Sequence, residues 1–260
     1  MLFALDIGNT ETTVGLFQGE QLLGHWRLTT TAARTPDEWG ALLSTYLTNA
    51  GHSPSGVRAV VVASVAPLVT QNVCAGVAAI TGVTPVQVDG RSELPITLDV
   101  AEPLTVGADR IVNTLAACRL FERDTIVVDF GTATTFDCIT KDGRFVGGVI
   151  MPGIRTAADE LVRRTAKLPA TELTPPERVI GRRTEDCIRS GVIWGTVDAV
   201  DGLIRRIRTE WPTRGEPPYV VATGGLAPLV APLTGEIETV QPDLTLVGLR
   251  LAAQALGLGW

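Results

Sequence analysis

One short motif occurs twice in this chain, about half its length apart, and it limits the possible folds more than any other feature. The motif is an aspartate, one further residue and a glycine, placed after an apolar run and followed by a threonine-rich turn. The matching positions are Asp6, Gly8 and Thr12 in DIGNTETT, and Asp129, Gly131 and Thr135 in DFGTATTF. Each copy precedes a strand-like segment, a glycine-containing turn and another strand-like segment. The repeat predicts an internally duplicated α/β unit, with two related domains around a cleft.

The pattern between and after the two copies alternates between strand and helix. Residues 57–65 form a valine-rich apolar run that is typical of a strand buried on both faces. Residues 35–38 begin a helix, and residues 67–80 and 184–211 have helical spacing. A last helix is expected over 246–256. The duplication predicts an amino-terminal domain over residues 1–121 and a carboxy-terminal domain over residues 122–260.

Composition excludes several classes of protein. With 260 residues, 45% of them hydrophobic, the chain can bury a large core, and its net charge of −6 disfavours nucleic acid as a partner. Arg205, Arg206 and Arg208 make a short basic run that is read as a solvated helix face. No run approaches the roughly 18 apolar residues of a membrane helix, and the amino terminus has no basic region typical of a signal peptide. Four widely spaced cysteines without a CxxC pair indicate free thiols in a reducing cytosol, so we expect a cytoplasmic protein.

Each D-x-G turn places backbone N–H groups and hydroxyls at the end of a strand, where glycine permits a phosphate to approach the backbone. The aspartate would repel a phosphate directly, so its expected task is to hold a cation that the phosphate also binds. The alternative for Asp6 is an ordinary hairpin residue that caps its own turn. The chain contains neither a Walker A sequence nor G-x-G-x-x-G after a strand, which disfavours those nucleotide folds.

Two further segments carry candidate site residues. Asp109 lies in the first turn of a predicted helix, where it is either a helix cap or a carboxylate held ionised to accept a proton. Arg110 beside it is either the partner of an anionic substrate group or part of a structural ion pair. Gly224 and Gly225 follow a short predicted strand, where a turn can approach a nucleotide.

The complete set of motifs resembles that of type III pantothenate kinases, in the actin, sugar-kinase and Hsp70 superfamily. The matching segments, in chain order, are Asp6–Thr10, Gly107–Arg110, Asp129–Asp137, Gly147–Gly153, Thr184, Ser190–Gly191, Gly224–Gly225 and Leu244–Leu249. The resemblance implies two ribonuclease-H-like domains around a nucleotide cleft. It also implies an ATP-dependent kinase that phosphorylates the primary hydroxyl of pantothenate, the first step of coenzyme A biosynthesis. Such enzymes are homodimers that use Mg²⁺ and a monovalent cation, K⁺ or NH₄⁺.

The same resemblance assigns roles to individual residues. Asp109 would be the catalytic base, Asp129 the ligand of the monovalent cation, and Asp6 would hold Mg²⁺ through water. The residues implied at ATP and its phosphates are Asp6, Gly8, Asn9, Thr10, Thr12, Thr13, Thr132, Gly224 and Gly225. Those implied at the acceptor are Val100, Gly107, Ala108, Arg110 and Thr184, of which Thr184 would reach the substrate of the dimer mate.

Four positions depart from the family pattern. Glu11 adds a negative charge to the first phosphate turn, which weakens ATP binding unless its side chain points to solvent or to the metal. Val100 stands where many relatives have an aromatic residue, and Glu102 and Arg183 stand where relatives have asparagine. These departures leave two alternatives: a kinase for another small alcohol, such as a nucleoside or a modified pantetheine precursor, and a nucleotide-binding regulator without catalysis. A regulator would not need to keep Asp6, Asp109 and Asp129 together.

Overall fold

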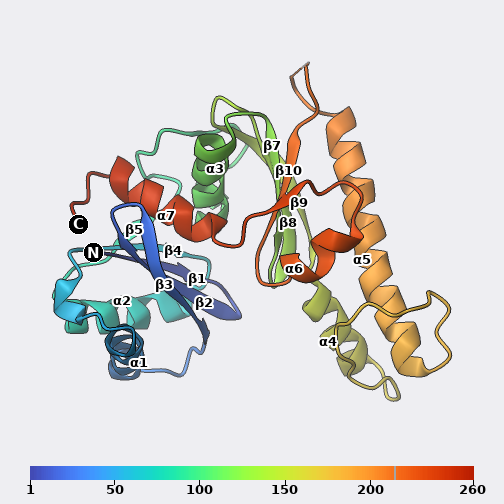
Figure 1. Ribbon diagram of the computed structural model, residues 1–260, viewed down its shortest axis with the longest axis horizontal. Coiled ribbons are helices and arrows are strands. Elements are labelled where there is room, and N and C mark those ends of the chain that lie inside the picture. Colours follow the sequence, from blue (N-terminus) through green and yellow to red (C-terminus); the bar gives the residue numbers. More distant parts are fainter. Residues whose placement is uncertain (214) are drawn as a thin grey trace. The chain divides into compact units, whose positions relative to one another are not determined.

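The structure, a computed structural model, describes residues 1–213 and 215–260, and the chain divides into two compact α/β units (Figure 1). The first unit contains Met1–Leu120, Asp142–Phe145 and Leu244–Trp260, and the second contains Phe121–Lys141 and Val146–Asp243. The sequence predicted two continuous domains, over residues 1–121 and 122–260. The observed division differs from that prediction in two segments. The four residues Asp142–Phe145 and the carboxy-terminal segment pack with the first unit, although both follow the second copy of the motif.

The sheet of the first unit has the strand order β3-β2-β1-β4-β5. Its strands are β1 (Leu2–Ile7), β2 (Glu11–Gln18), β3 (Gln21–Thr29), β4 (Ala59–Ser64) and β5 (Val86–Val88). Strand β1 runs antiparallel to β2 and parallel to β4. The expected strand over 57–65 is confirmed as β4, and its buried valines occupy both faces of the sheet.

The helices of the first unit cover both faces of this sheet. They are α1 (Pro36–Asn49), α2 (Pro67–Thr81), α3 (Ala108–Phe121) and α7 (Leu244–Ala255). Side chains alternate along β1, so Phe3 and Leu5 pack in one apolar cluster with residues of α1 and α2, whereas Leu2 and Ala4 pack in another with residues of α3 and α7. The α1 start is a capping box in which the Glu38 backbone N–H donates to the Thr35 hydroxyl at 3.3 Å and the Thr35 N–H donates to the Glu38 carboxylate at 2.8 Å.

The second unit repeats the strand order of the first. Its strands are β7 (Thr125–Phe130), β8 (Ala133–Ile139), β9 (Arg144–Pro152), β10 (Tyr219–Thr223) and β11 (Thr239–Val240). They lie in the order β9-β8-β7-β10-β11, with β7 antiparallel to β8 and parallel to β10. The duplication predicted from the two D-x-G copies is therefore confirmed. The short strand β6 (Thr97–Leu98) extends this sheet by pairing with Arg144 and Phe145 at the start of β9, two residues that belong to the first unit.

The second unit contains α4 (Ile154–Arg164), α5 (Thr184–Thr209) and α6 (Ala227–Val230), which pack on one apolar cluster with β7 and β10. The sequence predicted α5 over 184–211 but assigned no helix to α4. The apolar residues Ile154, Ala158, Leu161 and Val162 have helical spacing, so this helix was readable from the sequence. No helix in the described part of the chain has the length and apolar character needed to cross a membrane.

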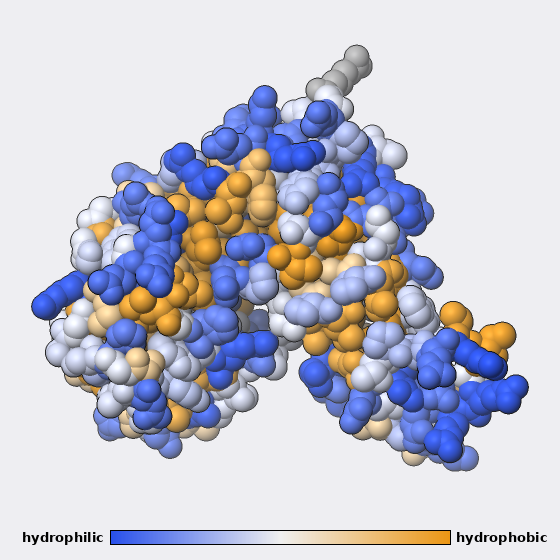
Figure 2. Space-filling model, viewed as in Figure 1, coloured by the Kyte–Doolittle hydropathy of each residue, from blue (hydrophilic) through white to orange (hydrophobic). Residues whose placement is uncertain are grey.

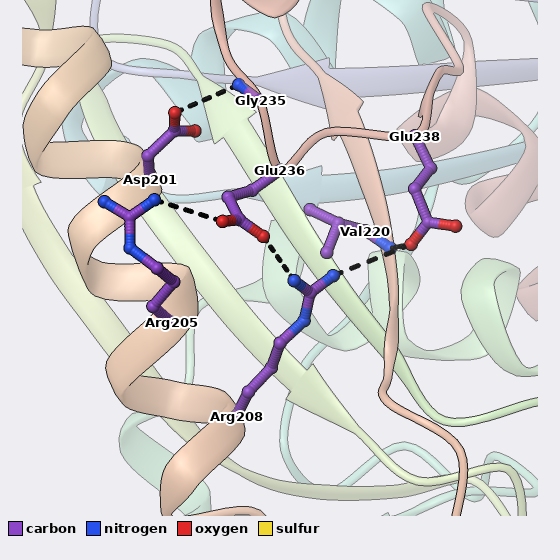
Figure 3. Close-up of polar contacts among 7 residues, drawn as sticks. All are labelled: Asp201, Arg205, Arg208, Val220, Gly235, Glu236 and Glu238. Atoms are coloured by element: carbon purple, nitrogen blue, oxygen red, sulfur yellow. Dashed lines mark hydrogen bonds and ion pairs between the residues drawn. The ribbon is translucent and has the colours of Figure 1, made fainter.

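Two arginines of the basic run on α5 belong to an ion-pair network (Figure 3). Arg205 contacts Glu236 at 3.1 Å, and Arg208 contacts both Glu236 and, at 3.8 Å, Glu238. Asp201, on the same helix, accepts the backbone N–H of Gly235 at 3.0 Å. The network holds α5 to the segment between α6 and β11, so much of the positive charge of this run is already neutralised.

Candidate functional site

The predicted site residues divide between the two units. The first unit contains the D-x-G turn from Asp6 to Thr13, together with Val100 and Gly107–Arg110. The second contains Asp129, Thr132, Thr184 and the Gly224–Gly225 pair.

The first D-x-G turn connects β1 to β2. The Gly8 backbone N–H donates to the Glu11 carbonyl at 3.0 Å, and a Cβ atom on Gly8 would lie 2.8 Å from that oxygen. Only glycine therefore fits this tight turn. Asn9 and Thr10 at its tip are exposed, which leaves them accessible to a ligand.

The two threonines that follow the turn face opposite sides of the sheet. Thr13 lies opposite the partly buried Asp6 in the β1–β2 register, and directly opposed residues project to the same face. Thr12 lies opposite Ile7, is fully buried, and shares a hydrogen bond of 2.9 Å with the Thr30 hydroxyl. Thr13 is therefore the better placed of the two to present a hydroxyl beside Asp6.

Glu11 forms an ion pair with Arg27 across the β2–β3 hairpin. Both side chains are about half exposed, so the carboxylate is directed to a cation at the surface. The pair reduces the repulsion that Glu11 would otherwise exert on a phosphate at the turn.

The start of α3 fixes the position of Asp109. The Arg110 backbone N–H donates to Asp109 Oδ1 at 2.8 Å, and a Cβ atom on Gly107 would lie 2.5 Å from the same oxygen. Burial raises the pKa of Asp109 above its ordinary value, although the backbone N–H and the guanidinium of Arg110 both oppose the shift. The Asp109 carboxylate is therefore a stronger proton acceptor than an exposed aspartate. Ala108, between Gly107 and Asp109, is buried against the core and anchors this turn.

The segment that carries Val100 follows strand β6. Val100 is partly buried, and Glu102 beyond it is exposed. The Glu102 carbonyl accepts hydrogen bonds from the Thr105 hydroxyl at 2.8 Å and from the Thr105 backbone N–H at 3.1 Å, which forms the short 3₁₀ turn Pro103–Thr105. The Glu102 side chain is thus directed outward while its backbone shapes the turn that precedes Gly107.

In the second unit, Asp129 at the end of β7 lies against the turn after β10. Gly224 in that turn has a φ of +88°, and a Cβ atom there would collide with Asp129 Oδ1 and with the backbone of Phe130. Glycine is required at this position for both reasons. Gly225 follows in the same turn, after the short strand β10. The contact between this turn and the second D-x-G turn was not predicted from the sequence.

Two residues beside this turn were missing from the sequence-based site. A Cβ atom on Gly153 would lie 2.5 Å from the carbonyl oxygens of Gly131 and Thr132, and the Thr156 hydroxyl donates to the Thr132 carbonyl at 2.6 Å. The start of α4 therefore braces the second D-x-G turn. The motif Gly147–Gly153 signalled part of this arrangement, but nothing in the sequence pointed to Thr156.

Thr184 stands at the first position of α5, where it lines a cavity of about 480 Å³. The cavity is also lined by Lys167, Pro169, Arg183 and Glu185. Arg183 and Thr184 are both exposed.

A metal site built only from side chains is absent from the part of the chain that the structure describes, since no three histidine, cysteine, aspartate or glutamate residues gather there. Asp129 Oδ1 lies beside the turn at Gly224 together with the backbone of Phe130. A carboxylate oxygen is a ligand type that an alkali cation takes.

Two units with one strand order, each with a D-x-G turn after its first strand, have the fold of the actin and sugar-kinase class. The sequence model of the type III pantothenate kinase family matches residues 2–206, and the chain belongs to that family. It is 44% identical over 252 residues to a type III pantothenate kinase of Desulfosudis oleivorans, with 96% of this chain and 98% of the relative covered. It is 43% identical to one of Thermomicrobium roseum, with 98% of each covered.

The fold of the chain is also similar to that of solved structures. A proposed 2-dehydro-3-deoxygalactonokinase from Sinorhizobium meliloti superimposes with a TM-score of 0.59 at 14% sequence identity, covering 98% of this chain and 97% of that one. At this identity the likeness concerns the fold alone.

Proposed function

We propose that this chain transfers the γ-phosphoryl group of ATP to the primary hydroxyl of pantothenate, the first step of coenzyme A biosynthesis. The observation that carries the proposal is the 44% identity to a type III pantothenate kinase over 96% of the chain. The start of α3 supports it independently, because it presents a carboxylate of raised pKa beside an arginine.

Asp109 acts as the base and Arg110 as the cationic partner of the acceptor's carboxylate. Successive side chains on a helix diverge, so the two can contact different groups of one substrate. Asp109 first orients the hydroxyl and then receives its proton. A loose transition state for phosphoryl transfer requires little nucleophile activation, so a carboxylate that takes the proton late is sufficient. Val100, Gly107 and Ala108 complete the acceptor site, and Thr184 reaches the substrate of the dimer mate.

The two D-x-G turns bind the nucleotide. Gly8, Asn9, Thr10 and Thr13 offer backbone N–H groups or hydroxyls to the phosphates from the first turn, and Thr132 does so from the second. Thr12, whose hydroxyl bonds to Thr30, supports the turn from the core side. Gly224 and Gly225 admit the nucleoside end of ATP to the backbone.

Asp6 holds Mg²⁺ through water, and Asp129 holds K⁺ or NH₄⁺. Each carboxylate is on the next-to-last residue of the first strand of its unit and is partly buried, so each can meet a cation at the carboxyl end of that strand. When bound, such cations neutralise charge on the phosphates of ATP.

We further propose a cytoplasmic homodimer. All four cysteines are free thiols, as is typical of a reducing compartment. Exposed aliphatic side chains in the second unit, Ile150, Leu161, Val179 and Ile180, offer an apolar surface for a second copy. Figure 2 shows exposed hydrophobic surface at the connector between α4 and α5, next to hydrophilic surface.

The test is an acceptor screen with purified protein, ATP and Mg²⁺. Pantothenate is compared with nucleosides, pantetheine and other primary alcohols, and product is measured as phosphorylated acceptor. Turnover of pantothenate with the highest kcat/KM supports the proposal. Turnover of a nucleoside or another alcohol alone would leave the kinase class intact and overturn the acceptor, whereas nucleotide binding without any turnover would favour a regulator.

A further inference from the structure

Among the described residues between Phe121 and Asp243, only the four-residue piece Asp142–Phe145 belongs to the first unit. It pairs with β6, where the Gly143 carbonyl accepts the Thr97 N–H at 2.9 Å and the Phe145 carbonyl accepts the Asp99 N–H at 2.9 Å. The Arg144 guanidinium also contacts the Asp99 carboxylate at 3.1 Å. Asp99 is the neighbour of Val100, so this piece holds the segment that carries one acceptor residue.

The same piece contacts α3 at two points. Gly143, with a φ of +81°, packs so closely that a Cβ atom there would lie 3.3 Å from Cys118 Sγ. The Phe145 ring, only 2% exposed, lies under the guanidinium of Arg110, whose Cζ atom is 5.0 Å from the ring centroid. This spacing is that of a cation–π contact.

We propose that Phe145 is a positioning residue of the acceptor site, because its buried ring orders the Arg110 guanidinium before the acceptor binds. The inference rests on the proposed function, in which Arg110 meets the acceptor's carboxylate. An arginine side chain loses much rotamer freedom when it is fixed, and that loss weakens binding unless the side chain is ordered beforehand. A ring fixed on β9 has already ordered it.

A positioning role for Phe145 and simple core packing predict different effects on the kinetic constants. Phe145 touches the group that binds the acceptor, and it does not belong to either D-x-G turn. Removing the ring therefore weakens acceptor binding in the ground state and the transition state alike, which raises the KM for pantothenate and changes kcat little. The KM for ATP stays the same.

The experiment is a double-mutant cycle with Phe145→Leu and Arg110→Met. Leucine keeps an apolar side chain of similar size but has no ring face. We expect Phe145→Leu alone to raise the KM for pantothenate about threefold to tenfold, the range of a partly desolvated cation–π contact. In the Arg110→Met background the same change should have less than about a twofold effect, because the ring then has no guanidinium to order. Phe145→Tyr, which keeps the ring, should restore most of the acceptor affinity.

Each outcome decides a different point. If the unaltered protein does not phosphorylate pantothenate, the proposed function is overturned and this inference with it. If it does, and Phe145→Leu raises the KM equally with and without Arg110, the ring acts only through packing and the inference alone is overturned. An unchanged KM for pantothenate in Phe145→Leu overturns it as well. A general loss of folding would lower the apparent kcat without raising either KM, so a rise confined to the KM for pantothenate separates the proposed role from misfolding.

Discussion

Arg27 forms an ion pair with Glu11 across the β2–β3 hairpin, at the edge of the first D-x-G turn. The sequence alone showed an acidic residue in a loop expected to bind phosphate, which is electrostatically unfavourable. The pairing across the hairpin explains how the turn tolerates that residue.

Removing this partner should expose the charge of Glu11 to the nucleotide. We expect Arg27→Met to raise the KM for ATP about fivefold at low salt, because two exposed charges a few ångströms apart interact by roughly 1 kcal/mol in water. Added salt should shrink the effect. The double variant Arg27→Met with Glu11→Gln should return to the original KM. Steady-state kinetics at two ionic strengths measure the effect of Arg27→Met, its salt dependence and the recovery in the double variant. A KM for ATP that is unchanged in Arg27→Met would show that Glu11 lies too far from the phosphates to affect binding.

Asp109→Asn keeps the shape of the side chain but removes the proton acceptor. We expect turnover to fall by about 10²-fold or more, the usual contribution of a general base, while ATP binding stays nearly intact. Single-turnover kinetics and nucleotide titration separate the two quantities. Phosphoryl transfer at the original rate would remove Asp109 from the mechanism.

The raised pKa of Asp109 also predicts a pH dependence. A base must be deprotonated to act, so kcat/KM for the acceptor should decrease as the pH falls through the pKa of Asp109. Because burial raises that pKa, the decrease should begin at a higher pH than the ordinary aspartate value of 3.8 would give. A pH–rate profile of the free enzyme measures this limb, and Asp109→Asn should lack it.

Asp129→Asn should weaken nucleotide binding in a cation-dependent manner, because it removes the carboxylate proposed to hold K⁺ or NH₄⁺. Gly224→Ala should have a related effect, since its Cβ atom would displace the same carboxylate and strain a residue whose φ is +88°. Gly202→Ala in α5 is a matched control, because its Cβ atom meets nothing within 4 Å. Activity titrations with K⁺ and NH₄⁺ give the result, and a K⁺ response in Asp129→Asn equal to that of the unaltered protein would refute the assignment.

Val100→Tyr should improve pantothenate binding. An aromatic ring supplies contact area that valine lacks, and Val100 is only partly buried, so a larger side chain has room. We expect a lower KM with little change in kcat, because the ground state and the transition state gain the contact alike. Saturation curves for the two proteins provide the comparison, and a tyrosine variant with an unchanged or higher KM would place Val100 outside the acceptor site.

The network around Glu236 predicts a difference in stability between two neighbouring arginines. Arg208 has a side chain 27% exposed and contacts both Glu236 and Glu238, whereas Arg205 is 60% exposed and contacts Glu236 alone. We expect Arg208→Met to lower the free energy of unfolding by about 1 kcal/mol, because it leaves the mostly buried Glu236 carboxylate without its main partner. Arg205→Met should cost less than about 0.5 kcal/mol. Urea unfolding of both variants measures the difference, and equal losses would show that exposure does not decide the strength of these pairs.

The sequence by itself determined the duplication, most helices and the chemical character of the site. Two D-x-G copies after apolar strands predict the repeated α/β unit, and local signals such as the Thr35–Glu38 capping box begin helices where the structure has them. Such features are readable because they depend on neighbours only a few residues away.

Only the tertiary structure decided which distant residues meet. It placed α7 on the first unit, because Leu246 and Leu249 pack with Leu2 and Ala4 of β1. It set Arg27 against Glu11 and the Phe145 ring under Arg110. It also buried Thr12 while leaving Thr13 beside Asp6, a choice made by strand register that a run of adjacent threonines cannot encode. These relationships depend on contacts between segments far apart in the chain, and no local pattern of residue types specifies them.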